Sequence, residues 1–262
     1  MSRYFSDEQI FKLEDELLSL PRKTQSLIEA FLLHNFLTNE GQEYAHHGIA
    51  RRLGTLEYAI QRVFECLPPT LDDLPDRRSA KDATIFIQAF VFNIFGLLDN
   101  LAFVWAFEAD VKGNNGLPLP NGRIGLTKDK IRLRESLPTD AQQYLEKSDT
   151  WLVNLERFRH SLGHRIPLYI PPFCIDPENA ERYRTINEQK REALNKHDFE
   201  YHEQLSAEQT ALTFFRPWMQ ASLNDPLPPV VFHAQLISDF ATAEEISWTF
   251  IKALRTLDFI ER

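Results

Sequence analysis

Residues 83–107 read ATIFIQAFVFNIFGLLDNLAFVWAF. The first 16 positions carry no charge, and Asp99 is the first charged residue of the stretch. Sixteen residues are fewer than the roughly 18–20 that a membrane span needs, and Gln88 and Asn93 interrupt the apolar run. A helix that is apolar on almost every side is instead the central helix of a folded core. The stretch therefore predicts a mainly α-helical protein, an antiparallel bundle around this helix, with no membrane association.

The segments before this helix also show helical periodicity. Ser6 followed by Gln9 forms a capping-box pattern, which predicts that a first helix covers 7–19. A second helix is expected to start near Pro21, because proline suits the first turn of a helix. A third should run from 42 to 66 and stop at the prolines that follow.

Beyond the apolar helix the composition changes. Residues 113–125 hold four of the nine glycines and two prolines, which predicts a long loop. The next helix should open near 138–140 and end at Gly163, since glycine tolerates the left-handed conformation of a helix C-terminus. Prolines then predict an extended segment near 166–173. Residues 178–209 read as a charged outer helix, and 230–259 as a closing helix.

The composition limits the classes of protein. The chain has 262 residues, 43% of them hydrophobic, and a net charge of −9. This fits one globular domain, with a core at roughly 40–175 and a peripheral helical region at 178–262. The acidic balance argues against a general polyanion-binding surface. Two cysteines and an N-terminus without an apolar leader favour a cytoplasmic protein without disulfides.

Residues 157–165 read RFRHSLGHR and concentrate three arginines and two histidines without an acid. Guanidinium groups bind phosphate, and imidazole exchanges protons near neutral pH, so the segment suits a phosphodiester substrate, RNA above all. The same residues also suit a last helical turn whose cations complement the helix dipole. His160 and His164 could share a metal, but Ser, Leu and Gly lie between them, and we expect no metal site.

Helix geometry restricts how these side chains can meet. Arg157, His160 and His164 would share one face of a helix. Arg159 and His164 are five residues apart, which places them about 140° apart around a straight helix. We therefore predict that the helix ends at Gly163, so that His164 turns back toward Arg159 and His160 supports the pair.

The segment from Arg159 to His164 resembles the Arg-x(4–6)-His signature of the HEPN superfamily, in which a polar residue follows the arginine. The proline-containing tail at 165–172 is similar to that of a group of uncharacterised bacterial HEPN-like proteins. The segment RRLGTL at 51–56 and the prolines at 68–69 are compatible with the same group. The resemblance covers roughly residues 40–175.

The resemblance implies a helical bundle that dimerises so that two copies of the motif face one cleft. Many members are metal-independent endoribonucleases, commonly toxins or defence effectors with an antitoxin or regulatory partner, and others only bind RNA, nucleotides or protein. Arg159 and His164 match the motif residues. An acidic or polar residue of an earlier helix often joins them, and Asp99 or Asn100 is our candidate; either could also be a polar residue packed at the bundle surface. A subgroup has a modified tyrosine two residues after the histidine, where this chain has Ile166.

Two hypotheses follow from these residues. The first is a metal-independent endoribonuclease in which Arg159 and His164 are catalytic and Arg157, His160, Asp99 and Asn100 support them. The second is a non-catalytic module that binds RNA, a nucleotide or a protein partner through the same cleft. Both predict a homodimer and neither requires a cofactor.

Overall fold

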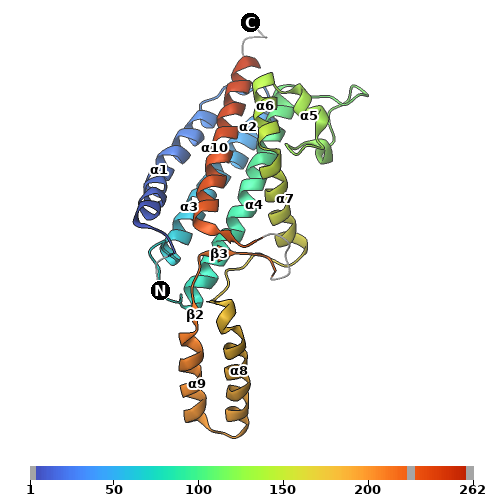
Figure 1. Ribbon diagram of the computed structural model, residues 1–262. Helices are drawn as coiled ribbons and strands as arrows, with labels where there is room; N and C mark the ends of the chain where they lie inside the picture. The colour runs from blue at the N-terminus through green and yellow to red at the C-terminus, as the bar shows by residue number, and fades with distance from the viewer. Residues whose placement is uncertain (1–3, 223–227, 258–262) are drawn as a thin grey trace.

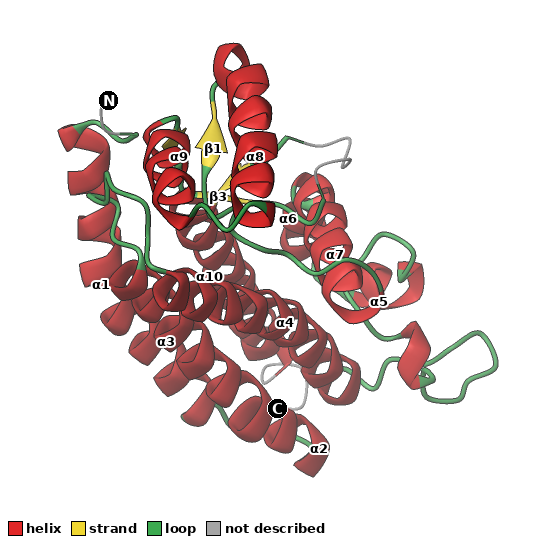
Figure 2. Ribbon diagram, turned by 90° about the horizontal axis from the view of Figure 1, so that it is seen from below, coloured by secondary structure: helices red, strands yellow, loops and turns green. Residues whose placement is uncertain are grey.

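The computed structural model describes residues 4–222 and 228–257, and within them the protein is a helical bundle with a projecting helical arm (Figure 1). The mainly α-helical fold is confirmed. The long helices are α1 (Asp7–Leu32), α3 (Ala50–Cys66), α4 (Arg77–Glu108), α7 (Asp149–His164) and α10 (Phe232–Leu257). Seen from below, α1 and α3 lie on one side, α4 and α10 in the middle, and α7 on the other side (Figure 2).

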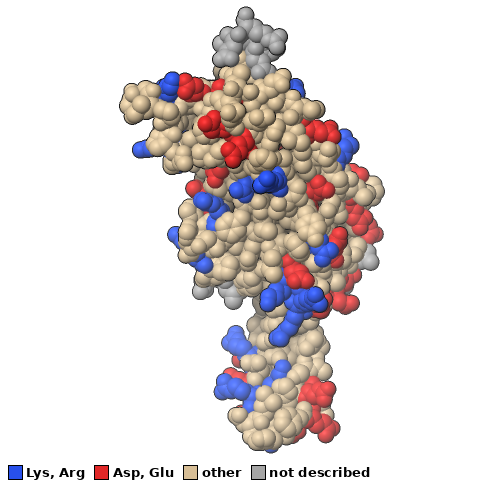
Figure 3. Space-filling view, turned by 180° about the vertical axis from the view of Figure 1, so that it is seen from behind, with Lys and Arg blue, Asp and Glu red and all other residues tan. Residues whose placement is uncertain are grey.

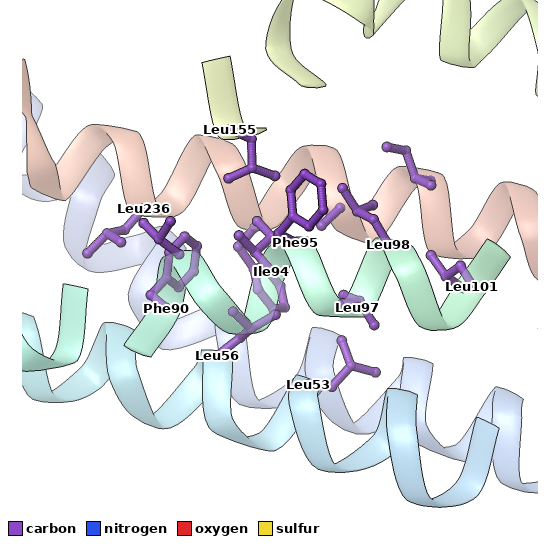
Figure 4. Close-up of a cluster of buried hydrophobic side chains, with 14 of the residues drawn as sticks. Leu53, Leu56, Phe90, Ile94, Phe95, Leu97, Leu98, Leu101, Leu155 and Leu236 are labelled. Atoms are coloured by element: carbon purple, nitrogen blue, oxygen red, sulfur yellow. The ribbon is translucent and has the colours of Figure 1, made fainter. Parts of the chain in front are cut away.

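Helix α4 forms the centre of the bundle, as the sequence predicts. Its apolar side chains pack against Leu53 and Leu56 of α3, Leu155 of α7 and Leu236 of α10 (Figure 4). By length and composition α4 could cross a membrane, but 67% of its most apolar window is buried inside the bundle. That burial is typical of a core helix. Asp76 caps its first turn by accepting hydrogen bonds from two backbone amides.

Helix α1 begins as predicted, with Ser6 and Gln9 forming the capping box. The predicted break at Pro21 is wrong, because α1 continues through this residue to Leu32. Proline removes one amide donor from the helix. Pro21 lies on the exposed side, where water can satisfy the freed carbonyl, while the buried Leu20 and Leu27 hold both halves against the core.

The third predicted helix is built from three consecutive pieces. These are α2 (Asn39–Glu43), the π-helical segment η1 (Tyr44–Ile49) and α3, which ends at Cys66 before the two prolines as expected. The buried carboxylate of Glu108 anchors the start. It accepts hydrogen bonds from the backbone amides of Leu37 and Thr38, at 2.7 and 3.0 Å, and from the Thr38 hydroxyl.

The region after α4 begins with the predicted loop at 113–125, which contains one short 3-10 turn, η2 (Asn121–Arg123). Helices α5 (Ile131–Ser136) and α6 (Thr139–Lys147) then lead into α7. The sequence predicted one helix where the structure has α6 and α7. The two are separated at Ser148, whose hydroxyl donates to the Tyr144 carbonyl, and a partly buried ion pair between Arg134 and Asp149 fixes the start of α7.

The extended segment near 166–173 is confirmed. Helices α8 (Ala180–Asn195) and α9 (Phe199–Ala211) follow, after a 3-10 turn at η3 (Pro177–Asn179), and form a hairpin that projects from the bundle (Figure 1). Two antiparallel strand pairs lie at its base. They join β1 (Cys174–Ile175) to β2 (Thr213–Phe214), and β3 (Trp218–Met219) to β4 (Val230–Val231).

The expected division into a core at 40–175 and a peripheral region at 178–262 needs correction. The hairpin of α8 and α9 is peripheral, but α10 packs in the middle of the bundle and buries Phe232, Leu236 and Phe250. Helix α1 also contributes to the same core through Leu27 and Phe31. The core therefore joins the two ends of the chain to its middle. The parts of the prediction that cover 223–227 and 258–262 lie outside the described residues.

Candidate functional site

The end of α7 differs from the prediction. The helix passes through Gly163, which has no positive φ, and ends at His164. Its last turn is closed by the Arg165 amide, which donates to the Ser161 carbonyl at 3.1 Å, and by the Ser161 hydroxyl, which donates to the Ile166 carbonyl at 2.7 Å. These bonds complete a regular helical turn, so the chain leaves the helix only after His164.

Arg159 and His164 consequently occupy different sides of α7. Helix geometry separates them by about 140°. The guanidinium carbon of Arg159 lies 4.6 Å from the centre of the Phe95 ring on α4. His164 is exposed, and its ring centre lies 6.0 Å from that of His160. The predicted approach of His164 to Arg159 within one chain, through a turn at Gly163, is therefore wrong.

Asp99 lies near enough to Arg159 for the two charges to interact. Burial raises the pKa of the Asp99 carboxyl, and the charges of Arg159, Arg52 and Lys130 offset part of that shift. Within residues 4–222 and 228–257, no side chain or backbone group hydrogen-bonds to this carboxyl. A half-buried carboxylate between arginines can orient a ligand or exchange a proton with it.

Asn100, the alternative candidate, is engaged by a residue that the sequence analysis missed. Arg52 of α3 donates from Nε to the Asn100 side-chain oxygen at 2.7 Å and from Nη1 to the Asn93 oxygen at 3.1 Å. Its guanidinium lies directly against Gly96, where a Cβ atom would be 2.4 Å from it. Glycine at this position is what allows the arginine to lie flat across α4.

The sequence contains a signal for this arrangement. Asn93, Gly96 and Asn100 recur every three to four residues along a helix that is otherwise apolar, so they share one face. A polar and small stripe of this kind predicts a polar side chain from the neighbouring helix. The neighbouring Arg51 is exposed instead, with a terminal nitrogen 3.1 Å from the His47 ring.

The remaining candidates lie apart from Arg159. The exposed His160 ring is 3.9 Å from the Glu156 carboxylate. Arg157 faces another side of α7 and lines a cavity of about 30 Å³ together with Phe158, Ser161 and Met219. We define the arginine–aspartate cluster as Arg52, Asp99, Asn100 and Arg159. The predicted residues thus divide into this cluster, the exposed histidines, and Arg157.

Charges on the molecular surface are mixed. In Figure 3, Lys and Arg atoms form separate groups with neutral and acidic surface between them. In the part of the chain that is described, no three His, Cys, Asp or Glu side chains gather in a way that could hold a metal ion. Comparison of the chain with protein-family models, curated proteins and solved structures found no match.

Proposed function

We propose that the protein is a metal-independent endoribonuclease with a HEPN-like Arg/His site, and that two copies of the chain complete the site. The observation that carries the proposal is the arginine–aspartate cluster, where Arg159 and Arg52 flank a half-buried carboxylate; His164 is exposed further along α7, on another side of that helix. A phosphate between these groups would meet fixed positive charge, with an exposed imidazole available for proton transfer.

The dimer is part of the proposal because one chain does not bring its own Arg159 and His164 together. A twofold axis close to α7 would place two copies of 157–165 in one cleft, so that the histidine of one copy can approach the arginine of the other. We expect the purified protein to sediment as a dimer at micromolar concentration. A monomer would remove the basis for a composite site.

In this proposal the reaction is an internal transesterification of RNA. The ribose 2′-oxygen forms a bond to phosphorus and gives up its proton, while the bond from phosphorus to the 5′-oxygen breaks and that oxygen gains a proton. His164 carries one of these protons and solvent water exchanges the other, while Arg159 stabilises the negative charge of the phosphorane. Asp99 acts on Arg159 through its charge and not through a hydrogen bond.

The test compares RNA cleavage in EDTA by the wild type, His164→Ala and Arg159→Ala. We expect both substitutions to reduce the rate by a factor of about 10²–10⁴, the usual contribution of a general acid–base group or a charge-stabilising donor. His202→Ala and Arg184→Ala on the hairpin arm are the matched controls and should cleave normally. Equal cleavage by all variants, or none by any, would exclude the nuclease.

A non-catalytic module that binds RNA, a nucleotide or a protein partner is the second candidate. It is favoured by the net charge of −9 and by the separation of the basic groups in Figure 3. In that case RNA would bind without being cut, and Arg159→Ala would weaken binding while His164→Ala would not. For either candidate, we propose a cytoplasmic role as a toxin, defence or stress protein held in check by an antitoxin or regulatory protein.

A further inference from the structure

The loop after α4 forms a cavity that the proposed nuclease site does not use. One wall is a tight turn at 113–117, closed by the Gly113 amide, which donates to the Leu117 carbonyl at 2.8 Å. The other wall runs from Arg123 to Glu135. The cavity has a volume of about 560 Å³, within the range of pockets that hold small molecules. The loop that forms it projects beside α5 in Figure 1.

Two guanidinium groups line the cavity, and each has N–H groups that can donate to a ligand. Within the described residues, the Arg123 guanidinium forms no hydrogen bond or ion pair, and only its backbone amide is engaged, by the Pro120 carbonyl at 2.7 Å. Arg132 donates from Nε to the Lys112 carbonyl at 3.0 Å, which fixes its direction and leaves both terminal nitrogens available. A planar guanidinium with free N–H groups is well suited to a phosphate.

The acids of the cavity do not cancel this charge. Asp129 is paired with Lys130 at 2.8 Å, and Lys130 also donates to the Gly122 carbonyl at 3.1 Å. The carboxylate of Glu135 has no ion pair among the described residues and can accept hydrogen bonds from a ligand. Among the described residues, two arginines of the cavity and one acid have no ion pair, which gives a local excess of positive charge in a protein whose total charge is −9.

An apolar wall adds a second recognition element. Leu119, Pro120 and Ile131 line the cavity, and Ile131 is 61% exposed. An isoleucine this exposed at the rim of a charged cavity offers a surface on which a planar ring can pack. In Figure 3 the projecting part at the upper left carries basic and acidic atoms side by side.

We propose that this cavity binds a free nucleoside monophosphate. Arg123 and Arg132 would hold the phosphate, Leu119, Pro120 and Ile131 would contact the base, and Glu135 would accept a hydrogen bond from a hydroxyl or amino group. The inference is independent of the nuclease proposal, because the cavity lies outside 157–165. Lys130 connects the two sites, since its charge also acts on Asp99.

Isothermal titration of the full chain tests the proposal with AMP, adenosine and inorganic phosphate. We expect AMP to bind, with adenosine and phosphate each at least about tenfold weaker, because each lacks one of the two recognition elements. Arg123→Gln and Arg132→Gln should each weaken AMP binding about tenfold or more. Ile131→Ser should weaken AMP binding without changing phosphate binding. Arg184→Gln on α8 is the charge-matched control and should bind as the wild type does.

Three outcomes would overturn the proposal. These are no binding of AMP at about 1 mM, unchanged binding by a folded Arg123→Gln/Arg132→Gln double variant, and binding only of a 5′-phosphorylated oligonucleotide. The last would assign the cavity to the end of an RNA chain. RNA cleavage by the same double variant separates the two proposals, because retained cleavage with lost AMP binding would leave the nuclease site intact.

Discussion

Helix α4 and the hairpin of α8 and α9 contain similar numbers of helical residues but are stabilised differently. Fourteen of the 32 side chains of α4 are buried, whereas the hairpin buries only Ile186, Ala193, Leu205 and Gln209. The hairpin also carries exposed ion pairs such as Arg182 with Glu208 at 2.8 Å, each of which contributes little to stability. The two regions therefore differ chiefly in how much apolar side chain they bury, and they should respond differently to substitution.

The largest difference should come from buried apolar side chains. Phe90→Ala in α4 removes a side chain that is fully buried and should lower the free energy of unfolding by about 3–5 kcal/mol. Leu205→Ala in α9 should instead open the hairpin locally and lower the global value by less than about 1 kcal/mol. Urea denaturation followed by circular dichroism measures the global effect, and amide hydrogen exchange measures the hairpin. Similar global losses in the two variants would contradict the comparison.

Titration of α10 should affect the bundle and leave the hairpin unchanged. Burial raises the pKa of Asp239 from 3.8 to about 6, so the folded protein holds a proton between these values that the unfolded chain has released. The contribution of Asp239 to the free energy of unfolding therefore falls as the pH rises from about 4 to 6. Burial lowers the pKa of His233 from 6.5 to about 4, so stability from His233 falls as pH decreases from 6.5 to 4.

The contributions of Asp239 and His233 to the free energy of unfolding change with pH in opposite directions, so they nearly cancel in the wild type. Asp239→Asn removes one of them, so unfolding free energy should rise by about 3 kcal/mol between pH 4 and 6.5, the value for a shift of about two pKa units. His233→Gln should give the opposite slope of similar size. Thermal denaturation over this pH range measures the pH profile of each variant. Hydrogen exchange of the hairpin, corrected for the pH dependence of the intrinsic exchange rates, is the reference that should not differ between them. Parallel pH profiles in the wild type and both variants would contradict this account.

Two glycines provide a sharper comparison within the bundle. Gly96→Ala places a methyl group against the Arg52 guanidinium and should cost about 1–3 kcal/mol of stability. Gly54→Ala, in α3, meets nothing within 4 Å and should stabilise by about 0.5–1 kcal/mol because alanine favours the helix. Chemical denaturation of both variants measures the difference. A neutral Gly96→Ala would show that Arg52 moves freely.

The smallest effect should come from the ion pair of the hairpin. Glu208→Gln removes the partner of Arg182, but both side chains are well exposed, so the change in stability should stay below about 0.5 kcal/mol. Hydrogen exchange in α8 and α9 is the suitable measurement, repeated at high salt, which should remove the difference. A large effect would mean that surface pairs stabilise the hairpin more strongly than the comparison assumes.

Sequence alone predicted features that depend on local patterns. The apolar run of α4, the capping box at Ser6 and the glycine-rich loop are all set by residues close together in the chain. Prediction from sequence failed for features that are set by packing between residues far apart in the chain. Pro21 remains inside α1 because the core holds both flanking turns, and Arg52 is placed by Gly96, which lies 44 residues away. The end of α7 depended on whether Gly163 adopts a positive φ, which glycine permits but does not require.

The π-helical segment η1 sets the rotational phase of the residues before and after it. A π-helical turn accommodates about one residue more than an α-helical turn, which rotates the upstream chain by about 100° relative to the downstream chain. The ring of Tyr44, the first residue of η1, stacks on Phe103 with centres 4.7 Å apart; downstream of η1, Arg52 points at Asn100. Helices α2 and α3 are continuous through η1. The change of helical register at η1 means that the two ends of this continuous helix direct differently oriented faces toward α4. It thereby allows the anchor at Glu108 and the arginine–aspartate cluster to lie along one side of α4.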